Sequence, residues 1–432
     1  MSFCELHVHL YGCLTAEKLF EIGRNNPSPR WSIFTDLYEK VHGKHFDVLN
    51  FFDKYGDIQK FKELYFFNRR APFIEFQSKF NLIIAFSVFD KNEISSVACD
   101  TLLEHFRQGI EHVEYRLMYS PRETKANYLE KTLAACEGLQ KGEEKSGGKI
   151  SGRMVVSLPR AGNYQENYHW LKEFMEQHNV IKKYLVGIDF CYIEEGFPPD
   201  EKRDFFQEVL KDNQAESSTT FSILYHVGES FADKTPFSAV RWILESAEYG
   251  AHRLGHCIAL GVQPQNFFGK SIMETVSERT KQLRYELDHY ESIREFGGYF
   301  SRNYLVSELD KLKHANPETQ IEIKMDQQTI NYLNTFQEFG MRHIQKFPSV
   351  IESCPTSNLY IGMIDDLPKH PLKRFVKNGL KVCVASDDPG IFDTTLQNEY
   401  ELCKAIGLSE NEIDRIKRNS FVYKSEYLSG RK

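Results

Sequence analysis

The 432-residue sequence lacks the features that would assign it to a membrane-spanning, secreted or nucleic-acid-binding class. No segment approaches the roughly 20 consecutive apolar residues of a membrane span. No charged stretch followed by an apolar one precedes the first strand-like segment, so we expect neither a membrane anchor nor a secretory signal. Basic charge is not in excess, because 54 Lys and Arg stand against 61 Asp and Glu, for a net charge of −7. We therefore expect no nucleic-acid partner.

Paired cysteines are also missing. The nine cysteines are an odd number and are scattered without close pairs. This pattern suggests neither a disulfide framework nor a Cys-x-x-Cys zinc site. We expect the cysteines on predicted strands to be small buried residues, and the protein to be cytoplasmic.

Short β-branched or apolar runs alternate along the chain with helix-like stretches, which is the pattern of βαβ units. Eight such strands favour one closed parallel barrel, a (β/α)₈ TIM barrel formed by a single domain over residues 1–432. The predicted strands are Phe3–Val8, His112–Met118, Arg153–Leu158, Tyr184–Phe190, Phe221–Val227, Arg253–Ile258, Ser349–Cys354 and Leu380–Ser386.

Two segments fall outside this alternation. Residues 34–89 are rich in aromatic side chains at helix-compatible spacing, which predicts extra N-terminal helices whose rings either pack in the core or cover a pocket, with Val48–Tyr55 as a possible lid. Residues 262–348 are long, highly charged and helical in character, which predicts a helical insertion between strands six and seven. Its charges form either a solvated face or an oligomer contact, and the sequence does not specify the oligomeric state.

Histidines stand at the ends of two predicted strands. In the first strand His7 and His9 are two residues apart and therefore project to the same side. His226 ends the fifth strand, Gly228 permits a sharp exit, and Glu229 follows on the next loop. Each signal alone also fits a structural role, as a core histidine or an acid in the first turn of a helix.

The sixth and eighth strands end in polar groups as well. His256 ends one, and the adjacent carboxylates Asp387 and Asp388 end the other. Barrel enzymes place their catalytic groups at the carboxyl ends of different strands, and we expect the histidines and carboxylates named above to meet there. Together they offer three histidines and an aspartate as metal ligands, which suits zinc without excluding other first-row metals. Glu229 and His256 remain as an acid and a base for a hydrolytic addition.

The order of these motifs resembles that of the adenosine deaminase family along nearly the whole chain. The main motifs are Glu5–Leu10, His226–Glu229, Arg253–His256 and Ser386–Pro389. Further matching stretches are Val113–Arg116, Ser120–Pro121, Gly187–Asp189, Cys354–Asn358, His370–Pro371, Ile391–Leu396 and Glu399–Tyr400.

The resemblance implies a zinc-dependent deaminase that converts a 6-aminopurine to a 6-oxopurine and releases ammonia. One zinc ion per chain would be held by His7, His9, His226 and Asp387. Glu229, in its protonated form, would donate to ring nitrogen 1, which needs a raised carboxyl pKa. His256 would orient the attacking hydroxide. Substrate contacts would come from His9, Tyr11, Tyr192 and Asp388, with Asp388 at ring nitrogen 7.

Two tyrosines depart from the family pattern. Tyr11 stands where the family usually has an acid that contacts the ribose 5′-hydroxyl, and Tyr192 stands where it usually has a glycine beside the purine. Each either contacts substrate or fills the space left by its counterpart. Without the acid, we expect a 5′-modified adenosine, an N6-substituted AMP or an aminofutalosine-type compound to be preferred over adenosine. The alternatives are a related hydrolase of a non-purine amidine or amide, and an inactive binding protein on this scaffold.

Overall fold

A computed structural model describes residues 2–298, 300–361 and 364–432. Eight parallel strands form the central sheet, in the order β1-β2-β3-β4-β5-β6-β9-β10. Their bounds are Phe3–His9, Ile110–Met118, Ser151–Ser157, Leu185–Asp189, Ser222–Val227, Arg253–His256, Val350–Ser353 and Val382–Val384. All eight predicted strands are confirmed, with ends that differ by two residues at most.

The first and last strands of the sheet meet and close the barrel. The His9 N–H donates to the Asp387 carbonyl at 3.0 Å, and the Asp387 N–H donates to the His7 carbonyl at 3.0 Å. A parallel bridge between Val8 and Asp387 completes the contact. Because this seam joins the strand that carries two histidines to the segment that carries two aspartates, barrel closure itself assembles part of the site.

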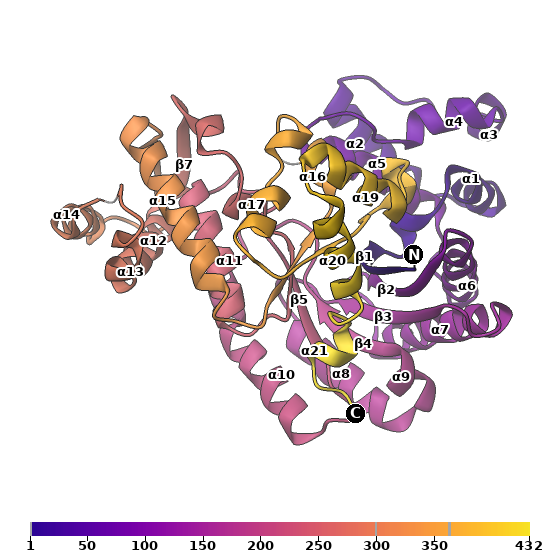
Figure 1. The fold of residues 1–432 in the computed structure, drawn as a ribbon. Coiled ribbons are helices and arrows are strands. Elements are labelled where there is room, and N and C mark those ends of the chain that lie inside the picture. Colours follow the sequence, from indigo (N-terminus) through magenta and orange to yellow (C-terminus); the bar gives the residue numbers. More distant parts are fainter. Residues whose placement is uncertain (1, 299, 362–363) are drawn as a thin grey trace.

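Helices surround the strands (Figure 1). Those that follow the barrel strands have amphipathic sequences, and they bury their apolar faces against the sheet. They are α6 (Lys91–Arg107), α7 (Lys125–Lys145), α8 (Tyr164–Gln177), α9 (Asn179–Tyr184), α10 (Arg203–Ala215), α11 (Pro236–Glu248), α15 (Gln327–Ile344), α16 (Pro355–Tyr360), α17 (Leu372–Lys377), α18 (Pro389–Phe392), α19 (Leu396–Ile406), α20 (Glu410–Ser420) and α21 (Ser425–Leu428).

The predicted N-terminal helices are present as α1 (Ala16–Asn25), α2 (Trp31–His42), α3 (Phe51–Lys54), α4 (Ile58–Tyr65) and α5 (Phe73–Phe86). Their aromatic side chains extend the hydrophobic core of the barrel, and Phe34, Phe51 and Phe61 are fully buried in it. Val48–Tyr55 forms no lid, because Phe51 packs into this core and no residue of the segment lines the pocket described below. Helix α5 covers that pocket instead.

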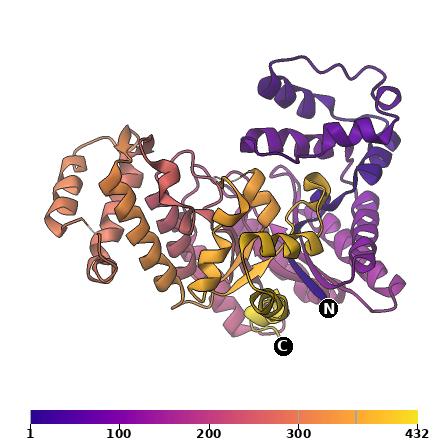
Figure 2. The same ribbon diagram turned by 45° about the horizontal axis from the view of Figure 1, so that its top comes forward.

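The insertion between β6 and β9 is not wholly helical, which corrects the sequence expectation. The last helix of residues 262–348, α15, packs against α11 as a barrel helix, and the rest of the segment forms the insertion. The insertion contains α12 (Val276–Asp288), α13 (Tyr290–Arg294) and α14 (Arg302–Leu312), and also an antiparallel pair of strands, β7 (Ser271–Thr275) and β8 (Gln320–Lys324). Both strands alternate more exposed with less exposed residues, a period of two that extends over only five residues in each strand and is easily missed within a long charged segment. Figure 2 shows the insertion and the N-terminal helices on opposite sides of the barrel.

Some charges of the insertion are buried rather than solvated. Glu274 is fully buried and accepts hydrogen bonds from the Thr235 N–H and hydroxyl and from the Ser238 hydroxyl. Glu278 pairs with the buried Arg241 of α11. These contacts join the insertion to the barrel. The prediction of a solvated face was therefore wrong for this part of the segment.

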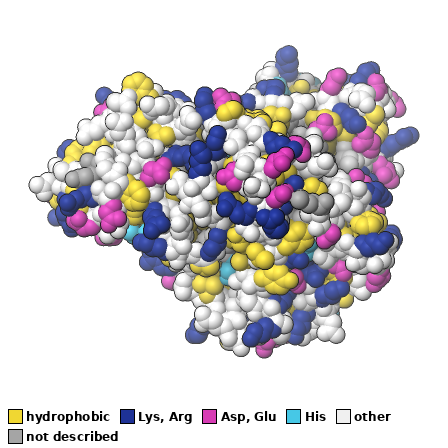
Figure 3. All heavy atoms as spheres, in the orientation of Figure 1, with side chains coloured by type: hydrophobic (Ala, Val, Ile, Leu, Met, Phe, Trp, Pro, Cys, Tyr) yellow, Lys and Arg dark blue, Asp and Glu magenta, His cyan; other side chains and the backbone are white. Residues whose placement is uncertain are grey.

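On the surface drawn in Figure 3, basic and acidic side chains are interspersed with one another and with apolar ones. All nine cysteines are free thiols, and eight of them are buried. Among the described residues, no helix combines the length and the apolar character needed to cross a membrane.

Candidate functional site

Five polar side chains converge at the carboxyl ends of the barrel strands. His7 and His9 lie on β1, His226 on β5 and His256 at the end of β6, and Asp387 follows β10. The backbones of His256 and Asp387 adopt positive φ angles of 64° and 63°. Non-glycine residues rarely adopt this conformation, and it clusters at functional sites where the surrounding structure enforces it.

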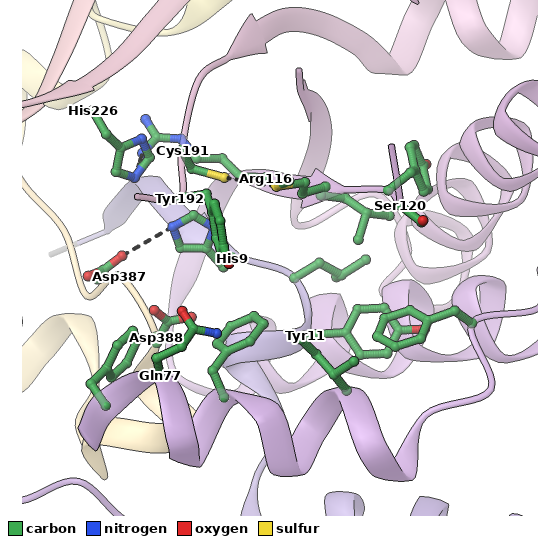
Figure 4. A pocket seen from close by; sticks show the side chains of 18 of the residues that line it. His9, Tyr11, Gln77, Arg116, Ser120, Cys191, Tyr192, His226, Asp387 and Asp388 are labelled. Carbon is green, nitrogen blue, oxygen red and sulfur yellow. Dashed lines mark hydrogen bonds and ion pairs between the residues drawn. The ribbon is translucent and has the colours of Figure 1, made fainter. Parts of the chain in front are cut away.

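Asp387 is the centre of this group. Its Oδ1 lies 3.3 Å from His7 Nε2. The same oxygen lies 3.4 Å from His9 Nε2, a contact drawn as a dashed line in Figure 4. The possible ligand atoms of His7, His226, His256 and Asp387 all lie within 4.8 Å of one another, and His9 groups with Asp387 and Asp388 beside them. The structure thus brings together all four residues that the resemblance assigns to zinc, with His256 among them.

Buried carboxylates orient two of the histidines. His7 Nδ1 lies 2.8 Å from Glu352 Oε2, and His226 Nδ1 lies 3.1 Å from Asp189 Oδ1. Each Nδ1–H therefore donates outward, which leaves Nε2 as the acceptor nitrogen. His226 Nε2 lies 3.5 Å from Arg116 Nη1, whereas the buried His7 Nε2 has no hydrogen-bond partner among the described residues. A histidine held in this way by a carboxylate is typical of a metal ligand, so the donor set fits a bound cation.

His256 has the opposite orientation of its ring proton. The Asn358 side-chain oxygen accepts from the Cys354 N–H at 3.3 Å, so its amide nitrogen faces His256 Nδ1, at 2.9 Å. Nδ1 is thus an acceptor, and Nε2–H points toward Glu229 Oε1, at 3.6 Å. Burial lowers the pKa of His256 well below its ordinary value, and His7 and His226 add to the shift. A neutral His256 therefore presents its Nε2–H to the site as a donor.

Glu194 fixes the backbone that positions Glu229. Glu194 accepts the Gly228 N–H at 3.0 Å and the Glu229 N–H at 3.2 Å. Gly228 has a φ of 68°, and a Cβ at this position would lie 2.4 Å from Ile243 Cδ1. Burial raises the pKa of Glu229 well above its ordinary value, and the nearby Asp387 and Glu194 raise it further.

Asp388 is a buried carboxyl with a free oxygen. Its Oδ1 has no hydrogen-bond partner, and burial together with the adjacent Asp387 raises its pKa well above the ordinary value. Gly12 makes room for it, since a Cβ on residue 12 would lie 1.6 Å from Asp388 Oδ1. Asp388 therefore offers a neutral carboxyl group to whatever enters the pocket.

A cavity of about 480 Å³ opens beside these groups. The predicted substrate contacts His9, Tyr11, Tyr192 and Asp388 all line it, together with Glu229 and His256. The Tyr11 hydroxyl donates to Glu93 at 2.9 Å, so only its ring is offered to a ligand. Tyr192 is 55% exposed and has a φ of 72°. Apolar side chains of α5, including Phe73, Phe76 and Phe80, form one wall.

Several of these residues were not predicted. Glu352 is a charged residue inside the apolar strand β9, a signal that could have been noticed, whereas Asp189 and Asn358 were seen only as family motifs without a role. The sequence predicted that rings of residues 34–89 pack in the core or cover a pocket, but it did not indicate that α5 is the helix that forms the wall. Its aromatic residues resemble those of the neighbouring core in spacing and type.

The comparisons with known proteins agree with one another. The adenosine deaminase family model matches residues 341–429. An adenine deaminase from Sinorhizobium medicae is 31% identical over 180 residues, which cover 41% of this chain and 51% of that protein. An adenosine deaminase from Shewanella denitrificans is 23% identical over 363 residues, or 81% of each chain. The chain spans at most about half the length of the curated adenine deaminases that it matches.

Solved structures share the fold over 98% of this chain. The apo N6-methyl-AMP deaminase of Arabidopsis thaliana matches with a TM-score of 0.57 and 18% identity, covering 92% of that chain. Arabidopsis ADAL complexed with IMP matches with a TM-score of 0.57 and 16% identity, covering 92%. An amidohydrolase from Burkholderia ambifaria with bound zinc matches with a TM-score of 0.55 and 14% identity, covering 85%.

The solved structures show that this chain shares the closed parallel barrel of amidohydrolase and purine deaminase structures. The family model over residues 341–429 and the curated relatives show that it is similar in sequence to adenosine and adenine deaminases.

Proposed function

We propose that this protein is a metal-dependent hydrolase that removes the 6-amino group of a purine. The observation that carries the proposal is the convergence of a metal-ligand cluster, Glu229, His256 and Asp388 around one cavity. The cluster would bind a cation, and Glu229, His256 and Asp388 would supply hydrogen-bonding groups whose protonation suits the edge of a purine ring. The relatives act on the same class of base, being adenine and adenosine deaminases.

Zinc is the metal that the donor set fits best. His7, His9, His226 and Asp387 would hold one ion, and three nitrogens with one carboxylate oxygen are ligands that zinc prefers. When bound, zinc lowers the pKa of water from 15.7 to about 7 and so makes a nucleophile available at neutral pH.

The protein's own side chains would place the base and move protons. Asp388, kept neutral by burial and by Asp387, donates a hydrogen bond to ring nitrogen 7, which is an acceptor. Glu229, also protonated, donates to ring nitrogen 1 and so draws electrons from carbon 6 as the water oxygen adds there. His256 Nε2–H hydrogen-bonds and orients that oxygen. The carbon–nitrogen bond then breaks, so that one water is consumed and one ammonia released.

The cavity favours a base that carries a substituent. Its volume of about 480 Å³ falls in the range of about 300–1,000 Å³ typical of pockets for drug-sized ligands. Arg30, Lys131 and Glu123 line one part of its wall. Glu123 pairs with Lys131, so the positive charge of Arg30 remains in excess there. Since Tyr11 replaces an acid, we propose a 6-aminopurine nucleoside with a 5′ substituent, a phosphate included, over free adenine or adenosine.

Ammonia release from a panel of purines tests this proposal. The panel contains adenine, adenosine, AMP, N6-methyl-AMP, 5′-methylthioadenosine and aminodeoxyfutalosine, each assayed with zinc-loaded protein of measured metal content. N6-methyl-AMP would release methylamine, so its product is followed as IMP. Turnover of a 5′-substituted member supports the proposal. A strong preference for adenosine or adenine would refute the substrate class, and silence across the panel from fully loaded protein would refute purine deamination.

A further inference from the structure

A second cluster of metal-binding residues lies away from the barrel mouth, where the insertion meets two barrel helices. Glu248 is the last residue of α11, His289 joins α12 to α13, and His343 lies near the end of α15. Their possible ligand atoms all lie within 4.8 Å of one another. Two helices and the α12–α13 junction thus bring two imidazoles and a carboxylate to one point.

Hydrogen bonding leaves His289 with its lone pair directed at a carboxylate. His289 Nδ1 lies 3.0 Å from the Tyr285 carbonyl, which only accepts, so the ring proton is on Nδ1. His289 Nε2 then faces Glu248 Oε1 across 4.0 Å. This distance is too long for a hydrogen bond, and two acceptors that face each other in this way gain nothing unless a cation lies between them.

The spacing of the cluster is close to that of ligands around a tetrahedral ion but not equal to it. Ligand atoms bound to zinc at about 2.0–2.2 Å lie roughly 3.3–3.6 Å apart in a tetrahedron. Glu248 Oε1 lies 2.8 Å from His343 Nε2, a hydrogen-bond distance, and 4.0 Å from His289 Nε2, so an ion would replace the first contact and shorten the second. The Tyr285 hydroxyl donates to Glu248 Oε1 at 2.7 Å, and the Tyr285 carbonyl orients His289. Outer hydrogen bonds of this kind orient metal ligands.

We infer that Glu248, His289 and His343 bind a second divalent transition metal, for which two nitrogens and one carboxylate oxygen favour zinc. The side chains of Glu248 and His289 are about one quarter exposed, so water can take the fourth position. Lys346 Nζ lies 3.5 Å from His343 Nδ1. Metal binding at Nε2 puts the ring proton on Nδ1, so this exposed lysine must turn away into solvent.

Such an ion would fasten the insertion to the barrel. Glu248 and His343 come from barrel helices, whereas His289 comes from the α12–α13 junction of the insertion. Because the ion would bind the folded arrangement and not the unfolded chain, it would add to the stability of this junction. The site lies outside the proposed active centre and does not depend on the proposed function.

Metal content measured on the tag-free, full-length protein tests the inference. Chelator-stripped protein is saturated with zinc, desalted and analysed by mass spectrometry of the metal. We expect two ions per chain in the wild type, and one in each of His289→Gln, Glu248→Gln and Asp387→Asn. The matched control His314→Gln, an exposed histidine of the insertion, should keep two.

The pattern of losses separates the two sites. The inference would be overturned if the wild type bound one ion and His289→Gln still bound it. It would also be overturned if His289→Gln and Glu248→Gln both kept two ions. If the wild type bound one ion and His289→Gln bound none, the result would support this site and refute the one at the barrel mouth. Circular dichroism on each variant shows whether it folds. Zinc should raise the melting temperature of Asp387→Asn, whose second site is intact, but not that of the double variant Asp387→Asn/His289→Gln.

Discussion

Replacing Glu352 by Gln tests how the barrel interior supports the site. Glu352 is fully buried, forms ion pairs with Arg116 and Arg253, and contacts His7 Nδ1 at 2.8 Å. Burial alone would raise its pKa, but Arg116, His7 and Arg253 hold the pKa well below its ordinary value, so the group is ionised. The substitution therefore leaves two buried guanidinium groups without their shared anion.

The expected loss of stability can be estimated from these contacts. Removing one partner of a buried ion pair costs about 3–5 kcal/mol. An unfolding entropy of about 2.1 cal/mol/K per residue gives roughly 0.9 kcal/mol/K for this chain, so the melting temperature should fall by about 3–6 °C. Because His7 also loses its orienting carboxylate, zinc affinity at the barrel mouth should fall by about 10–100-fold.

Calorimetric melting of the chelator-stripped protein at pH 6 and zinc titration followed by competition with a chromophoric chelator measure the two effects. The matched control is Glu399→Gln, a fully buried carboxyl whose hydrogen-bond donors are Thr356 and Thr394 rather than cations. It should change stability by no more than about 1 kcal/mol. Equal losses in the two variants would refute the reasoning, because the cost would then not arise from the guanidinium groups that lose Glu352, which keep only Glu114 and Asp189 as partners.

Three further predictions each follow from one contact or from the pKa of one residue. Gly12→Ala places a Cβ against Asp388 and should cost about 100-fold in kcat/KM by displacing that carboxyl; unchanged kinetics would contradict the role given to Asp388. Tyr11→Phe removes only the hydrogen bond to Glu93, so it should lower stability by about 1 kcal/mol and leave KM unaltered; a raised KM would assign the hydroxyl to substrate. Burial raises the pKa of Glu399 from 4.5 to about 7. Its contribution to the free energy of unfolding is therefore fully present below pH 4.5 and is lost as the pH rises through 7. The melting temperature of Glu399→Gln relative to wild type should therefore rise between pH 5 and 8, and a flat difference would refute the shift.

The strands and the groups at their ends were predictable because both depend on local sequence. Apolar runs with a polar residue at the end mark β5 and β6, and the spacing of His7 and His9 fixes their common direction. Asp387 and His9 meet only because the barrel closes, which the count of eight strands already predicted. The resemblance to a family added the roles of the individual groups, which spacing alone left open.

Features that depend on long-range contacts were not predictable. Glu352 contacts His7 across 345 positions of sequence, so nothing near either residue marks the pair. The short strands β7 and β8 were mistaken for helix because they lie within a long, highly charged segment and most of their side chains are at least partly exposed on both faces. Glu248 and His343 lie on two helices and His289 at the α12–α13 junction, far apart in sequence, and their convergence exists only in the folded chain.

The most direct test of the central claim is ammonia release by Glu229→Gln compared with the wild type, on the best substrate of the panel and at equal measured zinc. Gln keeps the shape of the side chain but cannot supply the carboxyl proton to ring nitrogen 1. We expect turnover to fall by about 10²–10⁴-fold, with zinc content and melting temperature nearly unchanged. Turnover close to that of the wild type would contradict the account, because the protonated Glu229 would then have no part in the reaction.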